Sequence, residues 1–157
     1  MLAVLCILSV LFVSGCRFHE IDYSGNAKNV ISKEQAEATI LRIMSEQFTR
    51  GSVVTQLTVN DECISFNECH RPLATLGTLN SKVTINFVTR YNIEIFRHRR
   101  SRSCDVVIWN NGAPVCEIVC FSMAEAMEFA DAYKFMHDYN SNKARLSSDS
   151  GKSAVKP

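Results

Sequence analysis

The chain has 157 residues, with 17 Lys and Arg against 16 Asp and Glu, which gives a formal net charge of +1. This near balance argues against a general nucleic-acid binder, which would carry a strong basic excess, so no nucleic-acid partner is expected. Apolar residues make up 46% of the chain and charged residues 21%, both near the averages of globular proteins. The composition therefore predicts a foldable chain with disorder confined to its ends.

The amino end is an uncharged apolar run from Leu2 to Val13, followed by Ser14, Gly15 and Cys16. A run of roughly a dozen residues is too short for the ~20 that a membrane-spanning helix needs. It has the length of the apolar region of an export signal, although no Lys or Arg precedes it as in most such signals. The alternative is a buried amino-terminal helix or strand. With the run set aside, about 140 residues remain, enough for one domain with a core.

The stretch Leu11-Phe12-Val13-Ser14-Gly15-Cys16 resembles the lipobox of bacterial lipoprotein precursors. In that family a diacylglyceryl group is attached to the cysteine sulfur, a peptidase cuts just before the cysteine, and the new amino terminus is usually acylated. The resemblance implies that residues 1–15 are a signal peptide and that Cys16 anchors the protein to a membrane of the bacterial cell envelope, facing the periplasm. In Gram-negative members an aspartate after the cysteine retains the protein in the inner membrane, so Arg17 implies the outer membrane. A secreted or periplasmic protein without lipid, cleaved near Gly15, is the alternative.

Two segments have helical patterns. Residues 16–31 are polar and turn-prone, and are expected to form a tether that holds the domain off the membrane. Ser32 and Gln35 then form a capping-box pattern, and apolar residues recur at helical spacing, which predicts an amphipathic helix over 33–50. A second capping box, Ser122 with Glu125, begins a carboxy-terminal helix to about residue 139.

The middle of the chain has the alternation and the β-branched residues of strands. The predicted strands are 52–59, 62–66, 83–87, 91–95, 105–109 and 114–121. The segment 67–80 is predicted to be a loop or an edge. Asn110-Asn111-Gly112 lies between two apolar runs and predicts a hairpin, because Asn-Gly is the strongest short-range hairpin signal.

These elements predict a single α+β domain over 32–139. Its core would be an antiparallel sheet or partly closed barrel of about five to six strands, with an N-terminal amphipathic helix and a C-terminal capping helix. The alternative is an open sheet with both helices on one face. Residues 140–157 are rich in Ser and Lys with almost no large apolar residue, and are predicted to be a disordered tail.

The end of this domain, Val-Cys-Glu-Ile-Val-Cys-Phe-Ser-Met-Ala-Glu-Ala-Met-Glu-Phe-Ala-Asp-Ala-Tyr over 115–133, resembles the last strand and carboxy-terminal helix of pleckstrin-homology-like domains. There, a strand leads into a Ser-initiated helix that plugs the barrel mouth. The resemblance covers about the last third of the domain, contains no diagnostic invariant residue and does not include the helix at 33–50.

The densest charge cluster is Arg97-His98-Arg99-Arg100-Ser101-Arg102. Arg97, Arg99, Arg100 and Arg102 form a candidate anion site, because arginine binds phosphate or carboxylate bidentately. In an exported lipoprotein the expected anions are lipid head groups, lipopolysaccharide or cell-wall polymer. The alternative is a solvated connection whose charge keeps the sheet edge from aggregating.

Seven cysteines are a high number for this length. Cys6 would leave with the signal peptide and Cys16 would carry lipid. The remaining five are disulfide candidates in an oxidising compartment, although five thiols cannot all pair within one chain. They are Cys63, Cys69, Cys104, Cys116 and Cys120. Cys63 and Cys69 are close enough in sequence to close a short loop, and Cys104 faces Cys116 or Cys120 depending on the hairpin register. The alternative for Cys116 and Cys120 is that they are small buried hydrophobic residues.

Catalytic and metal-binding patterns are absent from the sequence. No nucleophile elbow, zinc-protease helix or phosphate-binding glycine loop occurs, and the spacing of Cys63, Cys69 and His70 does not match a zinc site. No enzymatic activity, metal or cofactor is therefore expected. The predicted function is a membrane-anchored envelope lipoprotein whose small domain binds a protein partner or an anionic envelope component. A thiol-dependent envelope enzyme is the less favoured alternative, and would need an exposed cysteine of lowered pKa.

Two smaller expectations concern the carboxy-terminal half of the chain. Glu125, Glu128 and Asp131 are three residues apart and are expected on one solvated helix face. Tyr133, like Trp109 and Phe135, is expected in the core rather than in a ligand groove.

Overall fold

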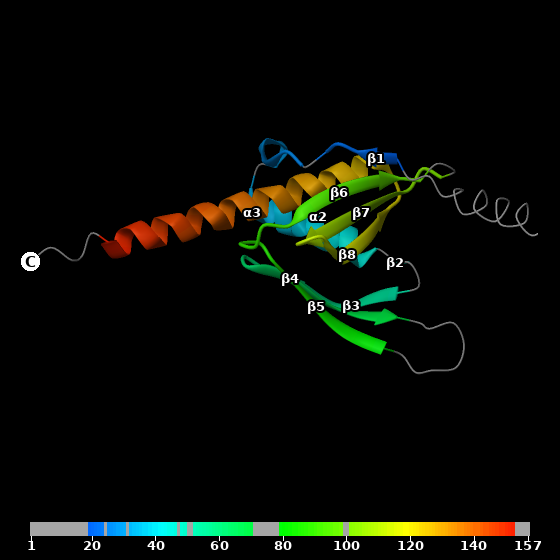
Figure 1. The fold of residues 1–157 in the computed structure, drawn as a ribbon, viewed down its shortest axis with the longest axis horizontal. Coiled ribbons are helices and arrows are strands. Elements are labelled where there is room, and N and C mark those ends of the chain that lie inside the picture. The colour runs from blue at the N-terminus through cyan, green and yellow to red at the C-terminus, as the bar shows by residue number, and fades with distance from the viewer. Residues whose placement is uncertain are drawn as a thin grey trace, which may run out of the picture.

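The residues that the structure describes form two antiparallel sheets and two long helices (Figure 1). The computed structural model describes residues 19–23, 25–30, 32–46, 48–49, 52–70, 79–98 and 101–152. In chain order the elements are β1 (His19–Ile21), η1 (Ala27–Asn29), α2 (Lys33–Ser45), β2 (Phe48–Thr49), β3 (Ser52–Val59), β4 (Cys63–His70), β5 (Leu79–Asn86), β6 (Asn92–Arg97), β7 (Cys104–Asn110), β8 (Ala113–Cys120) and α3 (Met123–Lys152). One sheet has the order β1-β6-β7-β8 and the other β2-β3-β4-β5. The α+β class and the antiparallel pairing are confirmed, but there are two open sheets instead of a partly closed barrel.

Helix α2 begins directly after the predicted cap residue Ser32, but it ends before the last residues of the apolar pattern that predicted it. The Ser32 hydroxyl accepts the backbone N–H of Gln35 at 3.2 Å, which satisfies one of the unpaired amides at the helix start. The helix buries a stripe of Ala36, Ile40, Ile43 and Met44. It ends at Ser45 and not near residue 50, because the following residues pair with β3 as β2.

The β7–β8 hairpin is built on the predicted turn. Asn110 lies opposite Ala113, and the two residues between them, Asn111 and Gly112, have φ values of 50° and 80°. Two successive positive φ values are typical of the type I′ turn that matches the twist of the two strands. This sequence prediction is confirmed.

Two strands of the second sheet, β4 and β5, are longer than the strands predicted from the sequence. Strand β4 continues to His70, and β5 begins at Leu79, with pairs from Cys63↔Asn86 to His70↔Leu79. Parts of the segment predicted as loop therefore form strand, because backbone pairing to a neighbour stabilises residues without strong strand propensity. Residues 71–78 of that segment lie outside the described residues.

Helix α3 covers one face of the first sheet and also contacts α2. Arg42 of α2 bridges to α3 at 2.8 Å from Glu128. The core between these elements takes side chains from both sheets and both helices. The largest fully buried side chains are Phe66, Phe87, Phe129, Ile40, Ile43, Met44, Ile64, Ile85, Ile95, Ile108, Ile118 and Met136.

The carboxy-terminal part of α3 corrects the prediction of a disordered tail. The helix runs to Lys152, and its distal part projects beyond the sheets (Figure 1). Buried Asn140 donates its side-chain amide to the Met136 carbonyl at 2.8 Å. Beyond it, residues 141–152 include the helix formers Lys143, Ala144, Arg145 and Leu146 and contain no proline, and the helix continues through Gly151. Residues 153–157 lie outside the described part.

Neither described helix combines the length and apolar character of a membrane span.

Candidate functional site

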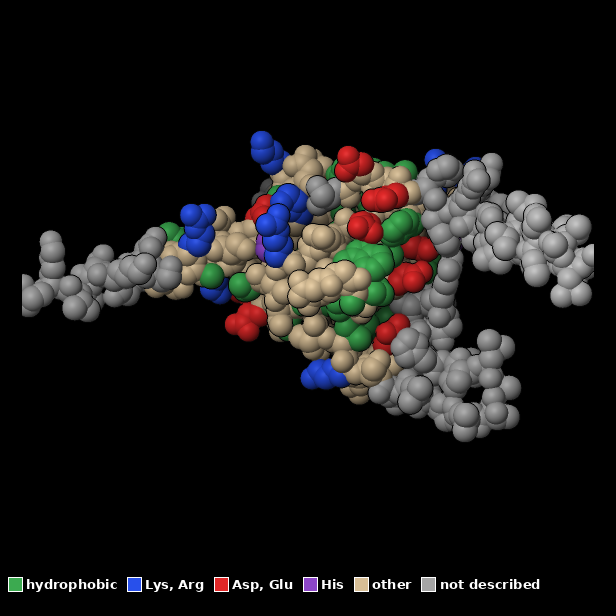
Figure 2. All heavy atoms as spheres, viewed as in Figure 1, with side chains coloured by type: hydrophobic (Ala, Val, Ile, Leu, Met, Phe, Trp, Pro, Cys, Tyr) green, Lys and Arg blue, Asp and Glu red, His purple; other side chains and the backbone are tan. Residues whose placement is uncertain are grey.

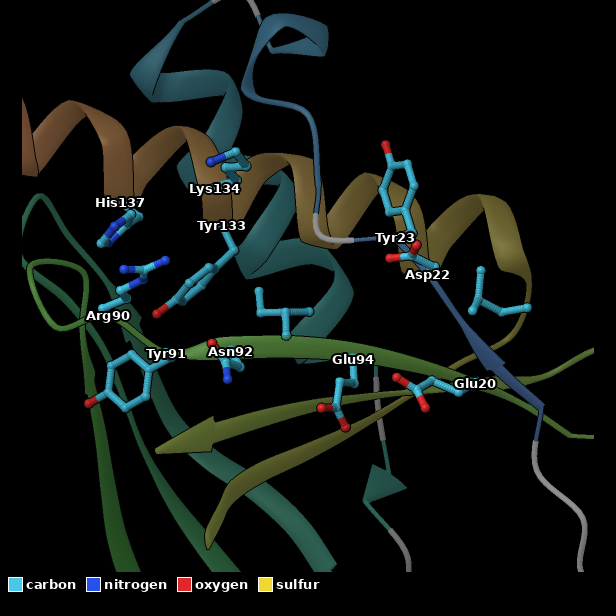
Figure 3. A pocket seen from close by; sticks show the side chains of 12 residues that line it. Glu20, Asp22, Tyr23, Arg90, Tyr91, Asn92, Glu94, Tyr133, Lys134 and His137 are labelled. Carbon is cyan, nitrogen blue, oxygen red and sulfur yellow. The ribbon is translucent and has the colours of Figure 1, made fainter. Parts of the chain in front are cut away.

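A cleft of about 410 Å³ lies between β1, β6 and α3, and Figure 3 shows the side chains that line it. This volume falls within the range of about 300–1,000 Å³ that is usual for small-molecule sites. It is an open cleft with charged and aromatic walls.

The first wall of the cleft is the segment that follows β1. Strand β1 pairs with β6 in the register His19↔Arg97, Glu20↔Phe96 and Ile21↔Ile95. The chain then turns away from β6, with the Tyr23 N–H donating to the Ile21 carbonyl at 2.8 Å. The beginning of β6 is therefore left beside the cleft.

Asp131 of α3 holds this segment in place. Its Oδ1 atom accepts the Tyr23 hydroxyl and the Asn26 backbone N–H, both at 2.6 Å. Its Oδ2 atom accepts the side-chain amide of Asn29 at 2.7 Å. The Asp131 side chain is buried, so the expectation that it lies on a solvated face is wrong. Hydrogen bonds to a charged acceptor are stronger than those between neutral groups.

Gly25 shows how closely this segment approaches α3. A Cβ atom at this position would lie 2.4 Å from the Ala130 carbonyl oxygen, and the Gly25 φ of +84° is disfavoured for other residues. The segment that was expected to be a loose tether over 16–31 is therefore packed against the domain wherever the structure describes it. The cause is contacts with residues about one hundred positions away in sequence.

One end of the cleft carries basic groups. Arg90 is exposed and makes no ion pair with the other described residues, and Lys134 lies 3.5 Å from Asp138. The His137 Nδ1 atom donates to the Phe87 carbonyl at 2.6 Å, which leaves Nε2 for another partner.

Tyr91 and Tyr133 line the wall of the cleft next to these basic groups. Tyr133 is 3% exposed and its ring packs 5.6 Å from that of Phe87, so it is a core residue as predicted, but it also lines the cleft. Its hydroxyl has no hydrogen-bond partner among the described residues. Burial raises the pKa of Tyr133, with a smaller contribution from Tyr91, so its hydroxyl stays a hydrogen-bond donor. An unpaired buried hydroxyl costs about 1–3 kcal/mol, which a bound acceptor would recover.

The other end of the cleft is acidic. Glu20 of β1, Asp22 and Glu94 of β6 lie there, opposite the end with Arg90 and His137 (Figure 3). Figure 2 shows a similar but incomplete separation on this face of the molecule. Most of the acidic side chains visible in this view lie over the half that contains β1, and most of the Lys and Arg side chains lie toward the half where α3 leaves the sheets, although some basic side chains are also visible near β1. The cleft is thus matched to a ligand with a cationic and an anionic end.

The arginine cluster lies at the end of the first sheet where β1 begins. Arg97 ends β6 opposite His19, and Arg102 is exposed in the connection to β7. His98 in this connection lies 2.8 Å from buried Asp105. Arg99 and Arg100 lie outside the described residues, as does the candidate lipidation residue Cys16.

The β7–β8 register decides which cysteine lies opposite Cys104. Cys104 is directly opposite Cys120, both are fully buried on the core face, and Cys116 is opposite Ile108. Directly opposed residues of antiparallel strands have Cα atoms about 4.5–5.5 Å apart, within the range of a disulfide. Burial raises the pKa of the Cys104 thiol, and that of Cys116 to about 12, which makes both poor nucleophiles.

Cys63 and Cys69 do not form the predicted short loop. Both lie on strand β4, six residues apart, which separates their Cα atoms by about 20 Å in an extended chain. A disulfide needs less than about 7 Å, so these two residues do not pair with each other. Cys63 is free. Among the described residues no group of three potential ligands is arranged for a metal.

No family model, curated protein or solved structure matches the chain. The sequence analysis did not name as site residues Arg90 and Tyr133, which line the cleft, or Asp131, which holds the neighbouring segment. Their partners and neighbours lie on other elements, and no local pattern indicates them. The one signal in the sequence is an aspartate inside a helix that is otherwise rich in apolar residues.

Proposed function

We propose that this chain is a bacterial envelope lipoprotein, anchored through Cys16, whose domain lies on the membrane surface and binds a protein partner or an anionic envelope component. The observation that carries the proposal is the position of β1, which begins only three residues after Cys16. An extended chain spans at most about 3.3–3.6 Å per residue, so His19 stays within about 11 Å of the lipidated residue. The lipid anchor and the folded domain are therefore adjacent.

The arginine cluster supports a contact with anionic head groups. Arg97 is the register partner of His19, and Arg102 is exposed in the same connection. A basic side chain near an anionic surface contributes about 1 kcal/mol, and the effect falls off within about 8 Å at physiological salt. The diacylglyceryl and amino-terminal acyl chains already give stable anchoring, so the basic residues would hold the domain against the surface and would not be needed for attachment.

The long helix indicates where a partner protein would bind. β1 lies at one end of the molecule, and the distal part of α3 extends at the opposite end (Figure 1). With the β1 end at the membrane, α3 projects into the periplasm. Leu146, 72% exposed on that helix, would be accessible to a partner there.

The anchor is tested by palmitate labelling in a bacterial host, followed by membrane fractionation. Label is expected on the wild type, none on Cys16→Ala, and full label on Cys6→Ala, which removes another cysteine of the same amino-terminal segment. Loss of membrane association in Cys16→Ala alone would support the proposal. An unlabelled wild-type protein in the soluble fraction would contradict it and favour the secreted or periplasmic module without lipid.

The head-group contact is tested on the chain without its first 16 residues, by flotation with vesicles of anionic phospholipid. The double variant Arg97→Gln/Arg102→Gln should bind about thirtyfold less well at low salt, since two contributions of about 1 kcal/mol each are lost. The control Lys28→Gln/Lys82→Gln removes the same charge from two exposed positions elsewhere on the domain. Equal binding of the two double variants would remove the anionic surface from the proposal and leave the anchor to its own test.

A further inference from the structure

Strand β6 has an open edge at its amino end. Strand β1 pairs with β6 only at Ile95, Phe96 and Arg97. The residues before them, from Asn92 to Glu94, pair with β7 on one side, and no described strand lies on the other. The cleft between β1, β6 and α3 lies along this edge.

The backbone of this edge presents hydrogen-bonding groups to the cleft. The His98 N–H donates to the Ser103 carbonyl at 3.2 Å, so the peptide groups of His98 point toward the β7 side. These groups alternate in direction along a strand, so those of Ile93 point away from β7, toward the cleft. An extended peptide could therefore pair with this edge in line with β1, as peptides do in β-strand addition.

The charges at the two ends give such a peptide a direction. A strand that continues the line of β1 runs antiparallel to β6, so its amino end lies near Glu94 and its carboxyl end near Asn92. The acidic residues Glu20, Asp22 and Glu94 lie at the first end of the cleft, and Arg90 lies at the second (Figure 3). An ammonium group would meet carboxylates, and a carboxylate would meet a guanidinium, in this orientation only.

We propose that this cleft binds a short peptide with free amino and carboxyl termini, added to β6 as an antiparallel strand. Opposite Asn92–Glu94 there is room for about three residues, since a strand rises about 3.4 Å per residue. A simple anion would be repelled by the acidic end and a simple cation by Arg90. The inference rests on the cleft alone and is independent of the lipid anchor at Cys16.

Tyr133 provides a second reason to expect a ligand. Its buried hydroxyl is a donor without an acceptor among the described residues, on the wall next to Arg90. Buried polar groups are rarely left unpaired unless a ligand or water completes them. A peptide carboxylate or carbonyl at this end would accept that hydrogen bond.

The proposal is tested by calorimetric titration of the detergent-solubilised full chain with three probes. They are trialanine, N-acetyl-trialanine and trialanine amide, which differ only in their terminal charges. Trialanine is expected to bind with a Kd on the order of 1 mM, and each capped peptide about tenfold more weakly, since each lacks one charge-assisted contact. Equal binding of all three peptides, or no binding of trialanine at about 10 mM, would overturn the proposal.

Variants assign each end of the peptide. Arg90→Gln should weaken the binding of trialanine about tenfold and leave the amide unchanged, whereas Glu94→Gln should weaken trialanine and leave the acetylated peptide unchanged. Lys82→Gln, on the exposed face of β5, is the control and should bind all three as the wild type does. If Arg90→Gln weakens all three peptides equally, the assignment of the carboxylate end is wrong.

Tyr133→Phe separates binding from folding. Because the hydroxyl has no partner in the described structure, its removal should leave the melting temperature of the protein unchanged or higher. Trialanine binding should nevertheless weaken by about fivefold to tenfold. Unchanged binding in a fully stable Tyr133→Phe variant would show that the hydroxyl does not contact the peptide and would contradict its role here.

Discussion

Replacing Asp131 with alanine should release the segment that joins the proposed anchor to the domain. The carboxylate accepts three hydrogen bonds, from the Tyr23 hydroxyl at 2.6 Å, the Asn26 backbone N–H at 2.6 Å and the Asn29 amide at 2.7 Å. Its side chain is only 7% exposed, so water does not easily replace it as an acceptor. The segment from β1 to η1 would then lose its main polar attachment to α3.

The expected loss of stability follows from these three bonds. A hydrogen bond to a charged group contributes about 1.5–3 kcal/mol, but the donors are partly exposed and regain water when released. We therefore expect Asp131→Ala to lower the free energy of unfolding by about 3–4 kcal/mol. Asp131→Asn keeps an oxygen for Tyr23 and Asn26 and turns an amide toward the Asn29 amide, so it should cost about 1–2 kcal/mol.

Two measurements test this reasoning on the chain without its first 16 residues. Urea denaturation gives the change in the free energy of unfolding, and limited trypsin digestion reports whether Lys28 in η1 becomes accessible. Cleavage at Lys28 should accelerate in Asp131→Ala before the rest of the domain is digested, because only this segment is released. The control is Asp138→Ala, a half-exposed acid on the same helix that pairs with Lys134 at 3.5 Å and should cost less than about 0.5 kcal/mol. If Asp131→Ala behaves like Asp138→Ala in both measurements, the segment is not held by Asp131.

Three further predictions concern backbone, ionisation and oxidation. Gly25→Ala should destabilise the protein by at least 1 kcal/mol more than Gly112→Ala, since both glycines have positive φ but only Gly25 lies against a helix carbonyl; equal melting temperatures would contradict the close contact. Burial, and then the hydrogen bond to the α3 carboxylate, raises the pKa of Tyr23 from its ordinary 10.0 to about 12. The unfolded chain therefore loses this proton first, so wild-type stability should fall between pH 10 and pH 12 more steeply than that of Tyr23→Phe in urea denaturation, and parallel curves would refute this. Peptide mapping of the exported protein under non-reducing conditions should give any hairpin disulfide as Cys104–Cys120, and a bridge from either residue to another cysteine would contradict the register.

Much of the local structure follows from short patterns in the sequence. The Asn111-Gly112 turn and the caps Ser32 and Ser122 act over about four residues, through the φ values that a residue tolerates and through hydrogen bonds to nearby amides. Glu125 completes the second cap by accepting the Phe121 N–H at 2.7 Å. Such contacts do not depend on the rest of the molecule, so the sequence alone predicts them.

The ends of elements and the fate of polar segments depend on distant parts of the chain. The strand β1, which the sequence indicated only as part of a tether, exists because the edge of β6 is available for pairing. The sequence pattern predicts Asp131 on the surface, but its side chain is buried. The groups that donate hydrogen bonds to it belong to residues more than one hundred positions away in the sequence. Cys104 has two possible neighbours until the β7–β8 register puts Cys120 opposite it.

The sequence by itself therefore determined the composition of the domain, its helix starts, its hairpin and the candidate anchor residue Cys16. The tertiary structure decided which segment lies beside the proposed anchor, which charges line the cleft and which edge of β6 stays open. The physical reason is range. Caps, turns and periodicity act between near neighbours, whereas strand pairing and buried hydrogen bonds join groups that only the complete fold brings together.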